Sequence, residues 1–205
     1  MEELLIVAGA HILAVASPGP DLALVLKNAL SGNKKVGIYT ALGIALGILV
    51  HVLYSVVGLA LVISQSIVLF NIIKLVGAGY LIWIGVKSLM SSKGPVTAST
   101  QVTTKSISTK EAIKQGFLTN VLNPKATLFF LSLYTQVISP NTSASLKLLY
   151  GAEMVTATFI WFTLVAIFMT RKPVQAVYEK IKHRIDQAFG VALIALGLKV
   201  ALDNK

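Results

Sequence analysis

The sequence predicts an all-α integral membrane protein with six transmembrane helices arranged as two inverted three-helix repeats. Three observations predict this fold class. The chain of 205 residues is 55% hydrophobic and only 13% charged, whereas a soluble domain carries about 25% charged residues. Its apolar residues form six runs, most of them near the roughly 20 residues that cross a bilayer. The first and fourth runs contain prolines, which predicts broken helices in spans 1 and 4.

The runs divide the chain into two similar halves. They cover 4–27, 37–63, 67–89, 115–138, 147–169 and 186–202. A shift of 104 positions, from Pro20 to Pro124, lays the first three runs over the last three. Because each half has an odd number of spans, the second half must insert upside down relative to the first, as in many secondary transporters.

We therefore expect a single membrane domain over 1–205. The first repeat occupies 1–90 and the second repeat 111–205. The Ser/Thr-rich segment 91–110, which has no apolar period, is expected to be a flexible linker between them.

The formal charge of +10 indicates topology rather than nucleic-acid binding, and we expect no nucleic-acid partner. The basic residues cluster in alternate loops: Lys34 and Lys35 in the first, Lys93, Lys105 and Lys110 in the third, and Arg171, Lys172, Lys180, Lys182 and Arg184 in the fifth. The positive-inside rule places these loops in the cytoplasm and both termini in the periplasm. In the fifth loop, Pro173 can begin a basic amphipathic helix that lies on the inner leaflet.

The first break is formed by Pro18, Gly19 and Pro20, directly before Asp21. Prolines remove backbone donors and disfavour helix before them, and glycine adds conformational freedom. Non-helical backbone at membrane depth occurs only where it is buried in protein or lines a wet cavity, and an ionisable group there indicates a functional site. Pro124 forms the second break in the same way, directly before Lys125.

Three motifs carry a family resemblance that extends over nearly the whole chain. They are Ser17-Pro18-Gly19-Pro20-Asp21 in the first run, the glycine-rich 74–85 in the third, and Gly116 to Ala126, with Asn123-Pro124-Lys125, in the fourth. In this order the motifs resemble those of the LysE/RhtB family of amino-acid exporters. The resemblance implies a multi-pass protein of the bacterial inner membrane that exports an amino acid, driven by the proton gradient. It does not identify the substrate.

Asp21 and Lys125 are the main candidates for the transport site. Asp21 can hold a substrate ammonium or a proton in alternation, or it can cap the helix that restarts after Pro20. Asp21 and Lys125 together can bracket a zwitterionic amino acid, with Asn123 and free backbone donors at the broken helix ends holding the carboxylate. Alternatively, Asp21 and Lys125 pair with each other, because unpaired charges in a membrane are costly.

Two further titratable residues are weaker candidates. His51 shares a helix face with Tyr39, Gly43, Gly47 and Ser55; it is either a proton site or a buried histidine bonded to a neighbouring helix, and the glycines indicate close packing. Glu153 is either a proton or cation site or an interfacial residue near the outer end of its span. His11, Trp83 and Trp161 are interpreted as packing or interfacial anchors.

Several function classes are disfavoured. The chain has no cysteine, which excludes thiolate catalysis and Cys-ligated metal, and it has no Gly-x-Ser-x-Gly or His-Glu-x-x-His motif of a hydrolase. We expect neither enzyme activity nor a cofactor. No deep charge other than Asp21, Lys125 and Glu153 stands out, which favours small neutral amino acids as substrates. The alternative is a metal or other cation exporter of similar architecture, and assembly into a homo-oligomer stays open.

Overall fold

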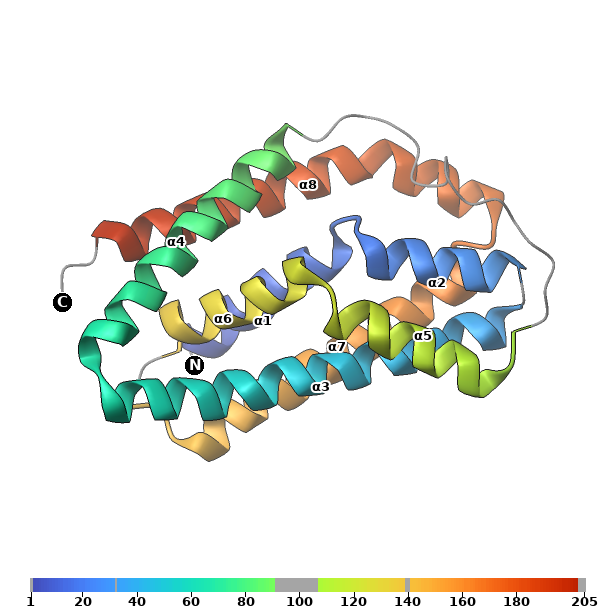
Figure 1. The fold of residues 1–205 in the computed structure, drawn as a ribbon. Coiled ribbons are helices and arrows are strands. Elements are labelled where there is room, and N and C mark those ends of the chain that lie inside the picture. The colour runs from blue at the N-terminus through green and yellow to red at the C-terminus, as the bar shows by residue number, and fades with distance from the viewer. Residues whose placement is uncertain (1, 32, 91–106, 139–140, 203–205) are drawn as a thin grey trace.

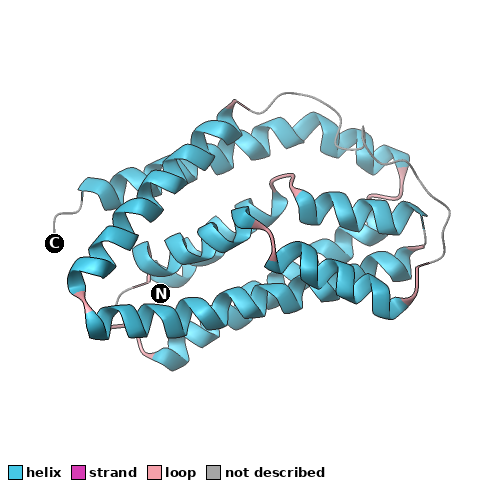
Figure 2. Cartoon of the chain, in the orientation of Figure 1, coloured by secondary structure: helices cyan, strands magenta, loops and turns pink. Residues whose placement is uncertain are grey.

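The computed structural model describes residues 2–31, 33–90, 107–138 and 141–202. In these ranges the chain forms eight helices and no strand (Figures 1 and 2). The helices are α1 (Glu2–Ala16), α2 (Pro20–Ser31), α3 (Lys34–Gln65), α4 (Ile67–Leu89), α5 (Thr109–Val121), α6 (Pro124–Gln136), α7 (Ala144–Phe168) and α8 (Lys172–Leu202). Most of the expected linker, at 91–106, lies outside the described residues.

Both expected helix breaks are present. α1 and α2 are separated by residues 17–19 and bend by 53°, and α5 and α6 are separated by residues 122–123. Pro20 and Pro124 are the first residues of α2 and α6, the position where a missing N–H costs nothing and the fixed φ suits the helix. The prolines thus end one helix and begin the next.

Length and hydropathy identify three described segments as candidate membrane spans, at Lys34–Gly58, Asn71–Leu89 and Ala144–Phe168, and a fourth if the bent pair α1–α2 counts as one. α5 and α6 have 13 residues each, too few to cross a bilayer singly. The fold is thus all-helical with several apolar helices of membrane-spanning length, and the six-span arrangement remains an expectation.

The broken helices lie between two pairs of long helices. α3 packs against α5 and α7, and α4 packs against α8 on the other side (Figure 1). The two breaks approach each other in the middle of the molecule (Figure 1). Residues as far apart in the chain as Asp21 and Asn120, separated by 99 positions, thereby become neighbours. The start of α1 and the end of α8 lie at the same end of the bundle as the turn between α3 and α4.

Glycines set the close approach of α3 to α5. A Cβ added at Gly43 would collide with the backbone of Ile113, one at Gly116 with the backbone of Thr40, and one at Gly47 with the side chain of Asn120. The interpretation of the α3 glycines as packing positions is confirmed. Small residues allow two helix backbones to come together where no hydrophobic force drives them.

The basic segment after α7 corrects one expectation. It does not form a separate interfacial helix, because it continues without interruption into the last apolar run as α8. Lys182, one of the basic residues of this segment, is 5% exposed and pairs with Glu179 at 3.2 Å. The hydroxyl of Tyr178 donates to the carbonyl of Ala16 at 3.2 Å, so this part of α8 packs against the end of α1.

Candidate functional site

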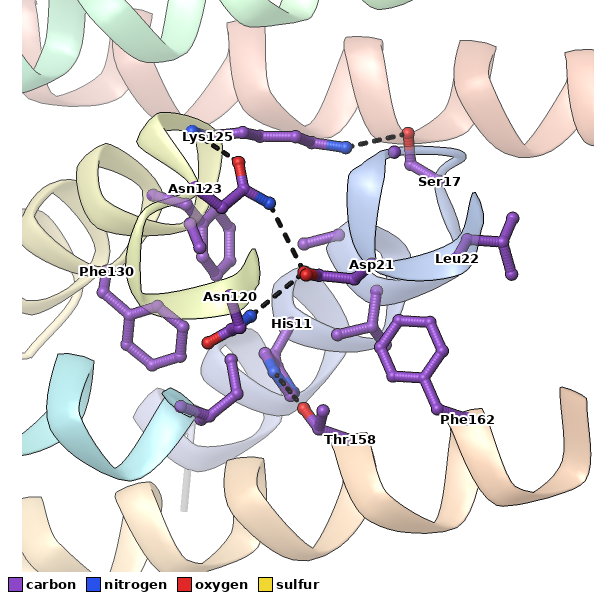
Figure 3. Close-up of a pocket in the computed structure, with 16 residues that line it drawn as sticks. His11, Ser17, Asp21, Leu22, Asn120, Asn123, Lys125, Phe130, Thr158 and Phe162 are labelled. Carbon is purple, nitrogen blue, oxygen red and sulfur yellow. Dashed lines mark hydrogen bonds between the residues drawn. The ribbon is translucent and has the colours of Figure 1, made fainter. Parts of the chain in front are cut away.

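A small cavity lies where the two breaks meet, and we call it the Asp21 cavity (Figure 3). Its volume is about 50 Å³. Since one buried water needs roughly 10–15 Å³, the cavity has room for a few water molecules. Its polar lining is His11, Ser17, Asp21, Asn120, Asn123, Lys125 and Thr158, and its apolar lining includes Leu22, Ile48, Phe129, Phe130 and Phe162.

Asp21 is bonded to the opposite half of the chain. Its Oδ2 accepts from Nδ2 of Asn120 at 3.0 Å and from Nδ2 of Asn123 at 3.3 Å. Its Oδ1 is buried and has no hydrogen-bond partner within the described part of the chain. Both recorded bonds of this carboxylate run to the α5–α6 break rather than to the backbone of α2, so Asp21 does more than cap its own helix. One buried acceptor stays available for a donor.

Lys125 reaches the same cavity from α6. Its Nζ donates to Ser17 Oγ at 3.3 Å and lies 4.9 Å from the ring centroid of Phe189. Across the described residues, no ion pair within 4 Å joins Lys125 to Asp21. The two opposite charges therefore face one cavity without neutralising each other directly, as Figure 3 shows.

Asn123 connects the two breaks. Its Oδ1 accepts from the backbone N–H of Lys125 at 3.0 Å, which caps α6, while its Nδ2 donates to Asp21. Asn120 also connects separate parts of the chain: its side chain donates to Asp21, and its backbone carbonyl is bonded to His51 Nε2 at 3.0 Å. The sequence indicated Asn123, but Asn120 is recognised only from the fold.

His51 and Glu153 do not line the Asp21 cavity. His51 is fully buried, bonds to Asn120 and to the Tyr54 hydroxyl at 2.7 Å, and stacks on Phe130. It therefore fits the expected buried histidine bonded to a neighbouring helix. Glu153 is partly buried, and its Oε2 is enclosed with no hydrogen-bond partner in the described residues.

His11 and Thr158 are functional candidates that the sequence did not indicate. The His11 ring is 1% exposed, and its Nε2 is 3.2 Å from Thr158 Oγ1. Both line the Asp21 cavity. Of the two interpretations of His11, the packing one agrees with its contacts to the Phe129 and Phe130 rings, and the interfacial one is corrected because the ring is buried. A lone histidine in an apolar run gives no hint of such a partner 147 positions away.

Asp186 is the most important residue missed by sequence reasoning. It is 4% exposed, and its Oδ1 accepts from the Ser17 hydroxyl at 3.0 Å. The expectation that only Asp21, Lys125 and Glu153 are deep charges is therefore wrong. A signal existed: Asp186 shares a helical face with the buried residues Tyr178, Lys182, Phe189 and Leu193, at the three- and four-residue spacing of a core-facing stripe.

A second cavity, which we call the Asp186 cavity, lies on the other side of the Ser17–Lys125 contact. Its volume is about 330 Å³, within the range of about 300–1,000 Å³ that is usual for ligand sites. It is lined by residues from α4, α6 and α8 and from the first break, among them Ser17, Tyr80, Trp83, Lys87, Lys125 and Asp186. No group of three or more metal-ligating side chains occurs in residues 2–31, 33–90, 107–138 and 141–202.

Apolar helices of membrane-spanning length, two helix breaks that meet inside the bundle, and charged groups facing cavities beside these breaks define a membrane transport protein. The model of the LysE type translocator family matches residues 12–204. The chain belongs to this family, whose members are transporters and not enzymes.

Named relatives match between 76% and 98% of this chain. The threonine efflux protein of Escherichia coli (strain K12) is 30% identical over 202 residues, 98% of each chain. The uncharacterized membrane protein YrhP of Bacillus subtilis (strain 168) is 31% identical over 204 residues, 93% of this chain and 94% of the relative. The leucine efflux protein of Salmonella choleraesuis (strain SC-B67) is 32% identical over 162 residues, 76% of this chain and 74% of the relative. No solved structure matches the chain.

Proposed function

We propose that this protein is a secondary transporter that exports small neutral amino acids from the bacterial cytoplasm in exchange for protons. Relatives named threonine and leucine efflux proteins support amino-acid export. The observation that carries the proposal is the pair Asp21 and Lys125, two opposite charges that line one cavity and are bonded to neutral groups instead of to each other.

The substrate is held between these two charges. Its ammonium binds the buried Oδ1 of Asp21, which lacks a hydrogen-bond partner among the described residues. Its carboxylate accepts from Lys125 Nζ and displaces the hydroxyl of Ser17. Charge-assisted hydrogen bonds are stronger than neutral ones, so the exchange of a neutral partner for the substrate favours binding.

The rest of the lining of the Asp21 cavity favours a substrate with a small neutral side chain. Ile48, Phe129, Phe130 and Phe162 make it largely apolar, and only the His11–Thr158 pair offers a polar contact. Because the cavity holds about 50 Å³, the bundle must widen to admit a substrate. A transport cycle that opens the cavity to one side at a time supplies such a movement.

The same carboxylate is the proposed coupling site. Asp21 binds either the substrate ammonium or a proton, so that release of one accompanies uptake of the other. In proteoliposomes, an imposed pH gradient should drive threonine or leucine uphill, and a trapped pH dye should report counterflow of protons. Uphill movement that persists after the pH gradient is collapsed would contradict proton coupling.

The arrangement in the membrane is part of the proposal: six spans, with α1–α2 and α5–α6 each forming one broken span, and both chain ends in the periplasm of the inner membrane. Supporting this, α1–α4 and α5–α8 follow the same order of a broken pair and two long helices. The Cys-free chain permits a direct test with single cysteines at Ser145, in the first turn of α7, and at Lys110, in the first turn of α5. An impermeant thiol reagent should label Ser145→Cys and not Lys110→Cys in intact cells.

Export is tested in cells whose own amino-acid exporters are disabled. Cells expressing the protein and loaded with dipeptides should release neutral amino acids faster than empty-vector cells. If no amino acid is released while tolerance to a toxic metal rises, the cation-exporter alternative replaces this proposal.

A further inference from the structure

The two cavities share Lys125 and Ser17 but have different carboxylates. Asp21 lines the smaller cavity and Asp186 the larger one. Ser17 accepts from Lys125 at 3.3 Å and donates to Asp186 at 3.0 Å. A hydroxyl thus connects the cation to the second carboxylate and separates the two spaces.

Resting on the proposed function, we propose that the Asp186 cavity is a second amino-acid site, in which Asp186 binds the substrate ammonium and Lys125 its carboxylate before the substrate passes to Asp21. Lys125 lines both cavities, so one lysine can serve the two sites in turn. At about 330 Å³ this cavity has the size of a ligand site, which the Asp21 cavity lacks in this conformation.

The placement of Asp186 is specific. The Ser88 hydroxyl donates to the backbone carbonyl of Asp186 at 2.7 Å, which fixes this turn of α8 against α4. A carboxylate has about four acceptor positions, so Asp186 can bind an ammonium while it keeps its bond to Ser17. A buried charge is costly when it serves packing alone, and an apolar residue would fill this face of α8 without that cost.

The other residues that line the Asp186 cavity suit a zwitterion that arrives from the C-terminal end of α4. Lys87 Nζ lies 4.1 Å from the Trp83 ring centroid, one turn beyond the aromatic pair Tyr80 and Trp83, whose ring centroids are 5.5 Å apart. Since α4 leads into the linker expected in the cytoplasm, the Asp186 cavity lies on the route from the cytoplasm to the breaks. The order of occupation is therefore Asp186 first and Asp21 second.

Trp83 provides a built-in reporter for the Asp186 cavity. The chain has two tryptophans, and Trp161→Phe leaves Trp83 as the only one. In nanodiscs, threonine or leucine should change the Trp83 fluorescence in a saturable manner. Asp186→Asn, which keeps an acceptor for Ser17, should raise the Kd at least tenfold, and Asp186→Glu should partly restore it.

The control is Glu179→Gln, which neutralises a carboxylate on the same helix that lines neither cavity and should leave the Kd unchanged. Calorimetric titration of the chain with both tryptophans should rank the variants in the same order, which removes dependence on the fluorophore. An Asp186 that only stabilises the fold would lower the melting temperature without changing the Kd.

The proposal is overturned if the Trp83 response survives Asp186→Asn, or if a wild-type protein that exports an amino acid gives no response to it. Failure of the proposed function looks different, since no amino acid would then leave the dipeptide-loaded cells at all.

Discussion

The two helix breaks differ in how the helix that starts after each of them is capped. At the second break, Asn123 caps α6 with its own side chain and donates to Asp21 with the same amide. At the first break, the residue before α2 is Gly19, which has no side chain, and the carboxylate of Asp21 is bonded to the other half of the chain. The second break has a side-chain cap of its own and the first has none, while the charged side chains of both breaks, Asp21 and Lys125, are bonded to the other half of the chain.

This difference has a consequence for transport. The bonds between Asp21 and the α5–α6 break and the bond between Lys125 and Ser17 must change if the halves separate, whereas the cap that Asn123 provides for α6 can stay intact. Asp21 and Lys125 are therefore the groups whose environments the movement alters most. The predictions that follow test this contrast.

The largest effect is expected from the charges. Asp21→Asn and Lys125→Met should each reduce export in dipeptide-loaded cells roughly a hundredfold, because removing one partner of a buried charged contact costs about 3 kcal/mol or more. The amount of protein in the membrane, measured by immunoblot, should be unchanged. Near-normal export by either variant would exclude that residue from the site.

The second-largest effect is expected from Gly116→Ala, which should lower the stability of the fold. The added Cβ would collide with the backbone of Thr40, and such overpacking costs about 1–3 kcal/mol. The melting temperature in detergent should drop clearly. The matched control is Gly79→Ala, where the Cβ would meet nothing within 4 Å and the melting temperature should hold or rise. Equal behaviour of the two variants would contradict the close α3–α5 contact.

Two substitutions of Asn123 distinguish its role as the cap of α6 from its role as a hydrogen-bond donor to Asp21. Asn123→Ser keeps a capping oxygen and Asn123→Ala does not, so the alanine variant should be less stable by about 1 kcal/mol. Both lose the amide that donates to Asp21, a bond to a charged group worth about 1.5–3 kcal/mol, and both should export at least severalfold more slowly. Normal export by the serine variant, with reduced export by the alanine variant, would show that only the cap matters.

The smallest effect is expected at Gly19. No glycine in residues 2–31, 33–90, 107–138 and 141–202 has a positive φ, and a Cβ at Gly19 would meet only Lys125 Nζ at 3.9 Å. Gly19→Ala should therefore change the free energy of unfolding by less than about 1 kcal/mol. A large destabilisation would show that the break needs the conformational freedom of Gly19, as the sequence suggested. In the structure, the break is explained by the prolines.

The sequence by itself determined the properties that depend on local chemistry. Apolar runs of spanning length predicted a helical membrane protein, and Pro20 and Pro124 predicted where two helices break, because proline acts on its own turn whatever surrounds it. The motifs at these prolines carried the family resemblance, which the match over 12–204 confirms, and named Asp21 and Lys125 as candidates.

Only the tertiary structure decided which polar groups meet. It brought Asn120 and Asn123 to Asp21, placed Ser17 between Lys125 and Asp186, and joined a segment expected on the membrane surface to the last apolar run. Ser17 and Asp186 are 169 positions apart, and their contact depends on how α8 packs against α1 and α4. No local pattern encodes such a distance, since the side chains that neutralise or bind a charge are selected by packing of whole helices and not by neighbours in the chain.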